Sequence, residues 1–411
     1  MRVVMAANWW YRRGGLGAVM LDEAAGLEAR GHEVVPFAAA HPDNVGTPWS
    51  RYFPPFLELS DDGRGLGPAA KAEAALDIVH NRAAARAFRH LLDDVRPDIV
   101  HIHNPSRQLS PSVIGEARGR GIPVVLTLHD YALICPQGQL LKGGRVACQP
   151  PNCVRGNMIH AVLNRCVHDS ALVSTVAATE HLVHRALGSY TRRVSRFIAP
   201  SRFVAESVAA AGIRRERVAL LANGIEPGTE PRPLPGTGGS VLFTGRLARE
   251  KGVHDLLEAA RRLPDVPFIV AGDGPQRIVQ STAAPPNVTF VGHLDSTALE
   301  DLRATAVAIV SPSTWFENAP IAVLEAMRAA RPVVATAIGG QPELLAYGGG
   351  VLVEPGDVAA PAAAVDRLWR DRTEAAELGR QGRAALVARY GLQRHLDGLL
   401  AVYDEVVGRG S

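Results

Sequence analysis

Residues 241–275 read VLFTGRLAREKGVHDLLEAARRLPDVPFIVAGDGP and decide the fold. The apolar runs at 241–244 and 268–271 have the length and the uninterrupted apolar character of buried strands. A turn and the start of a helix follow the first run, so the stretch predicts a strand, a helix and a second strand. Strands that alternate with helices in this way form a parallel sheet covered by helices.

The same alternation extends over the rest of the chain. Apolar runs of strand length recur at 3–7, 34–38, 98–103, 124–128, 196–199 and 218–222, and again at 288–291, 307–310, 333–336 and 351–353. Helical patterns separate these runs or close the chain, among them 18–29, 83–94, 373–389 and 392–407. The sequence therefore predicts an α/β fold with doubly wound parallel sheets.

A linker divides this pattern into two halves. Residues 226–239 read EPGTEPRPLPGTGG, and their four prolines and four glycines cannot continue a helix or a central strand. We therefore expect an N-terminal α/β domain at 1–225, the linker at 226–239, a C-terminal α/β domain at 240–389 and a last helix at 390–411 that packs back toward the N-terminal domain. Two such halves leave a cleft, and ligands bind these sheets outside the carboxyl ends of the strands.

Composition excludes several classes of protein. The 411 residues are 47% hydrophobic and 21% charged, as in ordinary globular domains rather than disordered or fibrous chains. No apolar run reaches the roughly 18–20 residues of a membrane-spanning helix, and the first residues fit a buried strand rather than a signal peptide. We expect a soluble, cytoplasmic protein.

Charge is uneven along the chain. The net charge is +3, but residues 1–196 hold 22 Lys and Arg against 17 Asp and Glu, a balance of 22 − 17 = +5. A solvated basic face explains this excess, and contact with an anionic acceptor or with the inner face of a membrane is the alternative. No long basic run with interleaved aromatic residues occurs, so nucleic acid is not an expected partner.

Two glutamates flank a predicted helix start in the second half, where residues 311–327 read SPSTWFENAPIAVLEAM. Asn318 is a suitable N-cap, so we expect the helix to begin near Ala319 and to point free N–H groups at the cleft, where they bind anions or hydroxyl groups. Glu317 precedes this terminus and Glu325 lies about two turns inside it. The pair can reach two parts of one ligand, and an acidic cap with a surface charge is the alternative.

Two cations follow the strand at 241–244. Arg246 and Lys251 stand at its carboxyl end and face the same cleft. Arginine binds phosphate oxygens with two donors and lysine acts as a point charge, so the pair suits a diphosphate. A surface pair without a ligand is the alternative interpretation.

These stretches carry a family resemblance. GRLAREKG at 245–252 and ENAPIAVLEAMRAARPVV at 317–334 resemble the donor half of retaining GT-B glycosyltransferases of family 4, which are marked by a Glu-x7-Glu motif, here Glu317 and Glu325. Where many relatives have Glu-Gly-Phe-Gly, this chain has ENAP at 317–320. Further matching segments span nearly the whole chain in order: GGLG at 14–17, TLHD at 127–130, ANGI at 222–225, AGDGP at 271–275 and GGQPE at 339–343.

The resemblance implies a GT-B fold, in which two Rossmann-like domains face each other across a cleft, and a nucleotide-sugar donor. Glu317 and His129 would be catalytic residues at the reacting sugar. By the same resemblance, Glu325 would bind the ribose, the pair at 246 and 251 the pyrophosphate, and the backbone at 318–320 the sugar hydroxyls. The implied donor-binding residues are Gly15, Gly17, Arg246, Lys251, Asn318, Ala319, Pro320 and Glu325.

The expected activity is retaining transfer of a sugar to a hydroxyl acceptor such as a glycan, a lipid or a natural product. UDP-hexose or UDP-N-acetylhexosamine is the first expected donor and GDP-mannose the second. The chain contains no Asp-x-Asp sequence, so we expect neither a catalytic metal nor a cofactor.

Three other functions remain as alternatives. A Rossmann oxidoreductase requires Gly-x-Gly-x-x-Gly after the first strand, and GLGAVM at 15–20 lacks the third glycine. A non-catalytic nucleotide-sugar-binding protein shares the site, and a GT-B epimerase or phosphorylase shares the fold.

Four cysteines fall within 32 residues in the pattern C-x12-C-x4-C-x12-C, from 135 to 166. A structural zinc site, reduced thiols and disulfides are all open. A cytosolic location disfavours disulfides, and the missing Cys-x-x-Cys pairs distinguish the pattern from the usual zinc motifs. The candidate ligands are Cys135, Cys148, Cys153 and Cys166.

Histidines and aromatic residues of the first half also have two interpretations. His129 is either at the reacting sugar or a satisfied histidine at a strand end, whereas His101 and His103 on the neighbouring strand are expected to be structural. The sequence WWYRR at 9–13 suits stacking on an acceptor sugar or entry into a lipid interface, and partial burial against the first helix is the alternative.

Overall fold

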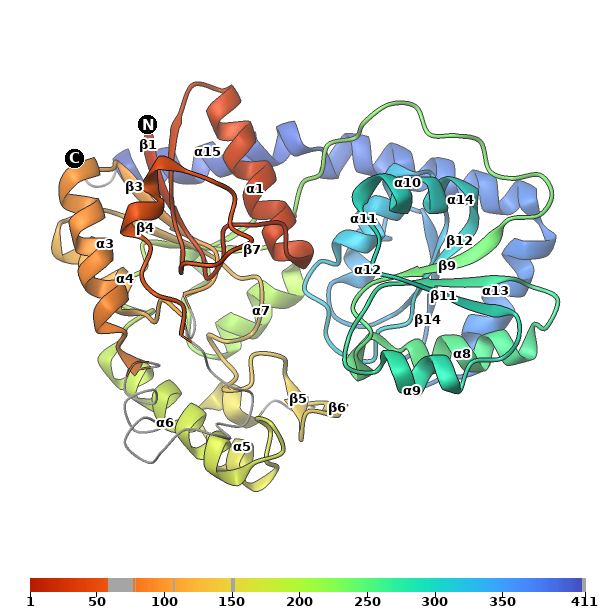
Figure 1. The fold of residues 1–411 in the computed structure, drawn as a ribbon, viewed down its shortest axis with the longest axis horizontal. Helices are drawn as coiled ribbons and strands as arrows, with labels where there is room; N and C mark the ends of the chain where they lie inside the picture. Colours follow the sequence, from red (N-terminus) through yellow and green to blue (C-terminus); the bar gives the residue numbers. More distant parts are fainter. Residues whose placement is uncertain (58–76, 78, 106–107, 149–151, 409–411) are drawn as a thin grey trace. The chain divides into compact units, whose positions relative to one another are not determined.

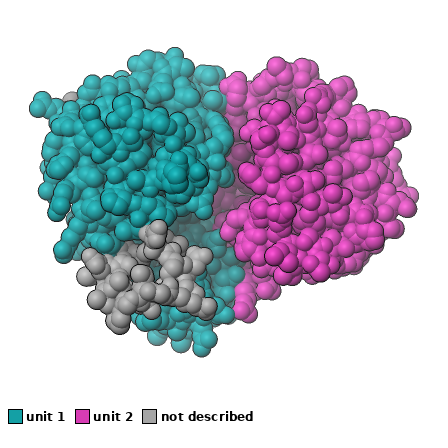
Figure 2. All heavy atoms as spheres, in the orientation of Figure 1, with its two compact units in different colours: residues 1–144, 148–222, 392–411 teal, residues 145–147, 223–391 magenta. Residues whose placement is uncertain are grey.

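The structure is a computed structural model that describes residues 1–57, 77, 79–105, 108–148 and 152–408. The chain forms two compact units, which Figure 2 colours separately. Unit 1 holds residues 1–144, 148–222 and 392–411, and unit 2 holds residues 145–147 and 223–391. The proline-rich stretch at 226–239 contains no helix or strand and lies within unit 2, whereas the last helix lies within unit 1.

Unit 1 is built on a six-stranded sheet in the order β2-β1-β3-β4-β7-β8, and its pairs are all parallel (Figure 1). Val3 of the central strand pairs with Val34 on one side and with Ile99 on the other. The inner strands are apolar on both faces, as expected for strands between two helical layers. The strands are β1 (Arg2–Ala6), β2 (Glu33–Phe37), β3 (Ile99–Ile102), β4 (Val124–Thr127), β7 (Arg196–Ala199) and β8 (Val218–Leu220).

The helices of unit 1 begin and end where the sequence supplies caps. The Asn81 side chain accepts a hydrogen bond from the Ala84 amide at 2.8 Å, and α6 ends at Gly188 in the left-handed region, with φ of 62°. The α-helices are α1 (Gly14–Ala29), α3 (Arg82–Val95), α4 (Ser112–Gly119), α5 (Ile159–Leu163), α6 (Ala171–Leu187), α7 (Arg202–Ala210) and α15 (Leu392–Gly408). Shorter elements of unit 1 are η1 (Pro48–Tyr52), β5 (Leu141–Lys142), η2 (Asn152–Arg155) and η3 (Arg215–Arg217), whereas the short strand β6 (Val146–Ala147) belongs to unit 2.

The last helix completes the core of unit 1. Its side chains Leu396, Leu399 and Tyr403 are 0% exposed and belong to the same apolar cluster as Val3 of β1. Helix α15 packs on α1 at Gly26, where an added Cβ would lie 2.4 Å from Leu396 Cδ1. A side chain larger than hydrogen at this position would therefore push the two helices apart or displace Leu396.

Unit 2 is built on a second parallel sheet, in the order β11-β10-β9-β12-β13-β14 (Figure 1). Strand β9 pairs with β10 on one side and with β12 on the other, so the segments that follow β9 and β12 leave the sheet at the same edge. The strands are β9 (Ser240–Thr244), β10 (Phe268–Ala271), β11 (Val288–Gly292), β12 (Ala306–Ser311), β13 (Val333–Thr336) and β14 (Gly350–Val353).

A buried arginine attaches the proline-rich stretch to unit 2. Arg331 is 1% exposed, and its Nη2 donates to the carbonyl oxygens of Arg232 at 2.9 Å and Ala304 at 2.7 Å. Burial lowers its pKa to about 10, so the guanidinium is still charged at neutral pH. The helical elements of the unit are η4 (Arg249–Lys251), α8 (Val253–Arg262), α9 (Arg277–Thr282), α10 (Ser296–Thr305), α11 (Ile321–Arg328), α12 (Gln341–Leu344), α13 (Ala360–Arg370), α14 (Arg372–Ala385) and the π-helical η5 (Leu386–Tyr390).

The predicted α/β class is confirmed. All twelve predicted strands are present, and no strand end differs from its predicted position by more than two residues. The predicted helix at 18–29 is longer, because α1 begins at Gly14, and the one at 373–389 ends as a π-helical turn. Among the described residues, no helix has both the length and the apolar character that crossing a bilayer would require.

Replacing Leu396 by Ala should test how far unit 1 depends on α15. We expect a loss of about 2–5 kcal/mol in the free energy of unfolding, because a fully buried leucine is removed from a packed interface. Denaturant unfolding followed by circular dichroism measures it. Leu187→Ala, at a position that is 57% exposed at the end of α6, is the matched control and should change stability by less than about 0.5 kcal/mol.

Candidate active site

The predicted donor residues of unit 2 gather at the carboxyl ends of β9 and β12. Arg246 and Lys251 follow β9, and Glu317 follows β12 after the segment 312–316. Because these two strands are neighbours in the sheet, residues 66 positions apart in the sequence come into contact. The structure therefore brings Lys251 and Glu317 together, as the sequence predicts for two residues that face the same cleft.

The Glu317 carboxylate is the buried centre of this group. Its side chain is 7% exposed, and Oε1 accepts hydrogen bonds from Lys251 Nζ and from Ser313 Oγ, each at 2.6 Å. Burial by itself raises the pKa of Glu317, but the charge of Lys251 and hydrogen bonds from Lys251, Ser313 and Trp315 outweigh burial and lower the pKa below its ordinary value. Glu317 is therefore ionised at neutral pH and neutralised by a cation.

Two glycines allow this close packing of loops. An added Cβ at Gly252, which has φ of 71°, would lie 1.7 Å from the Pro312 carbonyl oxygen. At Gly339, with φ of 64°, it would lie 2.3 Å from the Glu317 carbonyl oxygen, and the next amide, Gly340 N, donates to that oxygen at 2.6 Å. Only glycine fits at either position, so the chain around Glu317 is fixed by backbone contacts on two sides.

The predicted N-cap at Asn318 is wrong, and the helix begins two residues after its predicted start near Ala319. Helix α11 begins at Ile321, Pro320 is its N-cap residue with φ of −68° and ψ of 120°, and no side chain caps it. The Ala319 carbonyl instead accepts a hydrogen bond from Asn223 Nδ2 at 3.2 Å, and the extended Pro320 delays the first helical turn. Asn318 is therefore not the N-cap, and the sugar-binding role of 318–320 stays a prediction.

Glu325 lies on α11 and has a partner that the sequence does not predict. It forms an ion pair with Arg303 of α10, whose side chain is 4% exposed while that of Glu325 is 29% exposed. Burial lowers the pKa of Arg303 and the charge of Glu325 opposes this effect. Glu325 thus stays partly open to solvent, with its charge held in place by a buried arginine.

Arg246 is the more open of the two predicted cations. Its side chain is 52% exposed and pairs with Glu250, which is 10% exposed. Lys251 lies deeper and also faces the Trp315 ring, with Nζ 5.1 Å from the ring centroid. Both predicted phosphate ligands are therefore paired with carboxylates.

In unit 1, two of the implied donor-binding residues are part of a helix. Gly15 and Gly17 lie in the first turn of α1, and an added Cβ at Gly17 would lie 2.5 Å from the Tyr11 carbonyl oxygen. Gly17 is thus required by the packing of the turn on residues 11–12. The donor-binding role of Gly15 and Gly17 stays a prediction.

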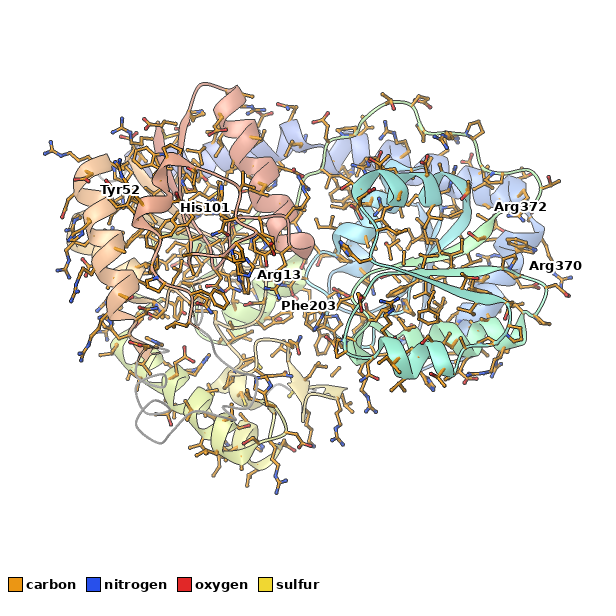
Figure 3. The ribbon with its side chains drawn as sticks, in the orientation of Figure 1. Arg13, Tyr52, His101, Phe203, Arg370 and Arg372 are labelled. Carbon is orange, nitrogen blue, oxygen red and sulfur yellow. The ribbon has the colours of Figure 1, made fainter. Side chains whose placement is uncertain are left out.

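The aromatic stretch at 9–13 divides between core and surface. Trp10 is 6% exposed and belongs to the apolar core of unit 1. The guanidinium of Arg13, labelled in Figure 3, lies 4.4 Å from the centroid of the Trp9 ring. Tyr11 stacks on His41 with ring centroids 5.0 Å apart. Burial thus explains Trp10, whereas Tyr11 is half-buried and Arg13 is exposed.

His129 lies two residues beyond the end of β4 and is partly exposed. Its Nε2 is 2.9 Å from His103 Nδ1. Burial, and then the charge of His395, lowers its pKa to about 3, so the ring is neutral at neutral pH. It borders a small pocket within unit 1 that is also lined by His103, Asn104, Pro105, Leu126, Thr127, Leu128, Asp130, Ala132, Leu133 and Tyr190.

Two groups in unit 1 offer metal-binding atoms. Glu23, His101 and His103 are buried and place three ligand atoms within 4.8 Å of one another. The four cysteines form no disulfide, and burial together with the three neighbouring thiols raises the pKa of Cys153 to about 11. The zinc site predicted for the cysteines stays a prediction.

Comparison with known proteins identifies the family. The sequence pattern described as "Glycosyltransferase Family 4" matches residues 13–228, more than half of the chain, and the one described as "Glycosyl transferases group 1" matches residues 229–385. The chain belongs to glycosyltransferase family 4. Its resemblance to that family, inferred from Glu317, Glu325 and the segments around them, is confirmed at the level of the family.

Individual relatives agree with this family 4 assignment. The chain is 28% identical to the glycogen synthase of Mycobacterium tuberculosis, over 98% of this chain and 94% of that protein. Among solved structures, the sucrose-phosphate synthase of Thermosynechococcus elongatus superposes with a TM-score of 0.70 at 19% identity, over the whole of both chains. HepE of Anabaena in complex with UDP-glucose superposes with a TM-score of 0.64 at 17% identity, over 98% of this chain and 99% of that one. The two α/β units of this family 4 glycosyltransferase therefore form a GT-B fold.

Several partners of the predicted residues were not predicted from the sequence, among them Arg303, Glu23, His395 and Tyr403. The last two lie in the buried stripe of α15, which runs Leu392, His395, Leu396, Leu399, Val402, Tyr403 and Val406 at helical spacing. A titratable side chain at an apolar position of such a stripe is a signal that the sequence does contain. Arg303 has no comparable signal, because arginine is common throughout the chain.

Replacing Lys251 by Met would leave Glu317 buried without its cation. We expect the free energy of unfolding to fall by about 3–5 kcal/mol at neutral pH, the range for a buried pair that loses one partner. Because the pKa of Glu317 is depressed, its ionised form contributes stability above its unfolded pKa, and that contribution is lost as the pH falls through the folded pKa. The difference between variant and wild type should therefore shrink in acid.

Denaturant unfolding at neutral and acidic pH measures this effect, with Lys142→Met, at an exposed lysine of β5, as the control. The further change Glu317→Gln in the Lys251→Met variant should restore part of the loss. An equal loss at both pH values would contradict the assignment of Glu317 as an ionised, paired carboxylate.

Proposed function

We propose that this chain is a retaining, metal-independent glycosyltransferase that moves a sugar from a nucleoside diphosphate to a hydroxyl acceptor. The observation that carries the proposal is the buried Glu317, held ionised by Lys251 and Ser313 at the edge where β9 and β12 end. A fixed carboxylate beside a lysine can bind sugar hydroxyls and a phosphate at once. The alternative of an acidic cap does not account for this pair, because α11 begins four residues later.

Each group has a physical role in the proposed reaction. The bond between the anomeric carbon and the diphosphate oxygen breaks, its electron pair stays on that oxygen, and the acceptor oxygen bonds to the same face of the carbon. The proton of the acceptor passes to the phosphate oxygen that has received the electron pair. Lys251 and Arg246 would stabilise the charge that develops there, since fixed cations need no reorganisation at the transition state. Glu317 would hold sugar hydroxyls and Glu325 the ribose.

A uridine nucleotide is the first proposed donor. HepE of Anabaena was solved with UDP-glucose, and the near full-length relative is named a glycogen synthase, which supports a hexose donor and a glycan among the proposed acceptors. GDP-mannose is the second proposed donor. The proposed location is the cytoplasm, with an anionic acceptor or a membrane surface as the partner of the basic first half.

Chelation and product stereochemistry test the mechanism. Activity with a UDP-sugar panel should survive EDTA unchanged, because Lys251 and Arg246 take the place of a divalent ion at the diphosphate. The anomeric configuration of the product, read by NMR, should equal that of the donor. Chelator-sensitive activity would contradict metal independence, and an inverted product would contradict retention. Turnover of the donor without an acceptor would indicate an epimerase or phosphorylase instead.

The two glutamates should separate in their effects. Glu317→Gln should keep affinity for UDP while lowering kcat roughly 10²-fold or more, the scale of a lost transition-state contact. Glu325→Gln should weaken UDP binding by about 1.5–3 kcal/mol, the value of a hydrogen bond to a charged group. Calorimetric titration beside initial rates measures both, and Glu300→Gln on α10, 60% exposed, is the control.

Equal losses of UDP affinity in Glu317→Gln and Glu325→Gln would contradict this division of roles. Unchanged activity in both variants would contradict the site itself. A wild-type chain that binds a UDP-sugar for hours without hydrolysing or transferring it would be the non-catalytic binding protein.

A further inference from the structure

Unit 1 buries a carboxylate that the proposed sugar chemistry does not use. Glu23 lies on the core-facing side of α1 between Met20 and Leu27, and its side chain is 2% exposed. The rings of His101 on β3, of His103 directly after β3 and of His395 on α15 surround it. His101, labelled in Figure 3, and His103 are themselves fully buried. Burying such a cluster costs free energy unless each charge has an opposite charge beside it and each hydrogen-bond donor faces an acceptor.

His395 is the cation that neutralises Glu23. Its Nε2 lies 2.9 Å from Glu23 Oε1, and its Nδ1 lies 2.7 Å from the Ala222 carbonyl oxygen. A carbonyl oxygen and a carboxylate only accept hydrogen bonds, so both ring nitrogens carry hydrogen when Glu23 is a carboxylate. Burial opposes this charge, but Glu23 and the Ala222 carbonyl together raise the pKa of His395 above its ordinary value. The pair is therefore an imidazolium and a carboxylate.

The second oxygen of Glu23 faces His103. Oε2 lies 3.4 Å from His103 Nε2, and neither atom has a hydrogen-bond partner among the described residues. Burial, with neighbouring histidines, lowers the pKa of His103 well below its ordinary value, so the ring is neutral and carries one hydrogen. A carboxylate oxygen attracts an N–H and repels a nitrogen lone pair, which places that hydrogen on Nε2.

The state of His103 then determines the state of His129. With its hydrogen on Nε2, His103 has a lone pair on Nδ1, and this atom lies 2.9 Å from His129 Nε2. A hydrogen bond at that distance requires His129 to donate from Nε2. Because His129 is also neutral, its own lone pair is on Nδ1.

We infer that Glu23 is a positioning residue for sugar transfer, acting through His103 to fix the tautomer and orientation of His129. This inference rests on the proposed function, because the group that His129 Nδ1 would serve is a hydroxyl of the donor sugar. His129 Nδ1 would accept a hydrogen bond from that hydroxyl, and the ring borders the small pocket of unit 1 that Asn104 and Asp130 also line. Glu23, paired with His395, keeps the hydrogens of His103 and His129 on their Nε2 atoms.

A metal ion at Glu23, His101 and His103 is the competing use of the same atoms. It would require a lone pair, not a hydrogen, on His103 Nε2, and it would add two positive charges beside the buried His395 imidazolium. His101 is already satisfied on both sides, by Thr127 Oγ1 at 2.7 Å and by the Tyr403 hydroxyl at 2.7 Å. The charges of the cluster and the positions of its hydrogens therefore favour the positioning role of Glu23 over a metal site.

The wild-type enzyme provides the first test. Nitrogen-15 NMR of the histidine rings should show His129 with hydrogen on Nε2 and a bare Nδ1, and His103 in the same tautomer. This readout needs neither a substrate nor a variant. A His129 ring with hydrogen on Nδ1 would overturn the inference, as would one tightly bound divalent ion per chain with a bare His103 Nε2.

Glu23→Gln is the second test, because it preserves shape and removes the charge. If the glutamine turns its amide N–H₂ toward His103 and its oxygen toward His395, the hydrogens of His103 and His129 switch to Nδ1. We expect kcat to fall roughly 10–100-fold, the usual range for a residue that orients a ligand-binding histidine, with little change in the donor KM. Glu28→Gln, at an exposed glutamate of the same helix, should change neither quantity.

A purely structural role of Glu23 predicts a different pattern. Tyr403→Phe removes a buried hydroxyl from the same cluster without touching the path from Glu23 to His129, so it should lower stability and leave the His129 tautomer and kcat unchanged. If Glu23→Gln switches the tautomer but keeps full kcat, or loses activity with the tautomer unchanged, the positioning role is wrong. If the wild type transfers no sugar, the proposed function fails while the predicted tautomer can still be found.

Discussion

The cost of burying a carboxylate organises both units of this chain. An ionised carboxyl group loses several kcal/mol of hydration when it leaves water, so it persists only beside a cation and hydrogen-bond donors. Glu317 has Lys251, Ser313 and Trp315, and Glu23 has His395. The partners come from far along the sequence: Lys251 is 66 residues from Glu317, and His395 is 372 residues from Glu23. Each pair therefore fixes elements that the chain alone does not place together.

The pair of Glu23 and His395 gives a physical reason for the return of the chain to unit 1 in its last helix. After the sheet of unit 2 is complete, α15 supplies Leu396, Leu399 and Tyr403 to the core of unit 1 and His395 to its buried carboxylate. The same helix thus closes an apolar surface and supplies the cation that Glu23 requires. In unit 2, one side chain likewise serves two segments. The buried Arg331 donates hydrogen bonds to carbonyl oxygens of the proline-rich stretch and of α10. Unit 1 therefore takes part of its core from a segment outside its main run of alternating strands and helices.

The sheets were predictable and the local geometry of the site was not. Runs such as those at 241–244 and 268–271 determine strands because a strand between two helical layers is apolar on both faces, and that pattern is local. The start of α11 depends instead on the contact between Asn223 and the Ala319 carbonyl, 96 residues apart, which holds the backbone extended after a good capping residue. Arg303 was not predicted because its contact with Glu325 is also tertiary: only the fold brings the two side chains together. The motif located the glutamates; the tertiary contacts determine their partners.

The protonation state of His129 limits what this residue can contribute to the proposed reaction. With a pKa of about 3, His129 is uncharged at neutral pH, so it can orient a hydroxyl but can neither neutralise a phosphate nor donate a proton as an imidazolium. In the proposed reaction, positive charge for the departing diphosphate would come from Lys251 and Arg246, which are both paired with carboxylates. Lys251 would thus be held in place by Glu317 before the donor arrives, and the charge that develops on the leaving oxygen would meet a cation that does not have to move.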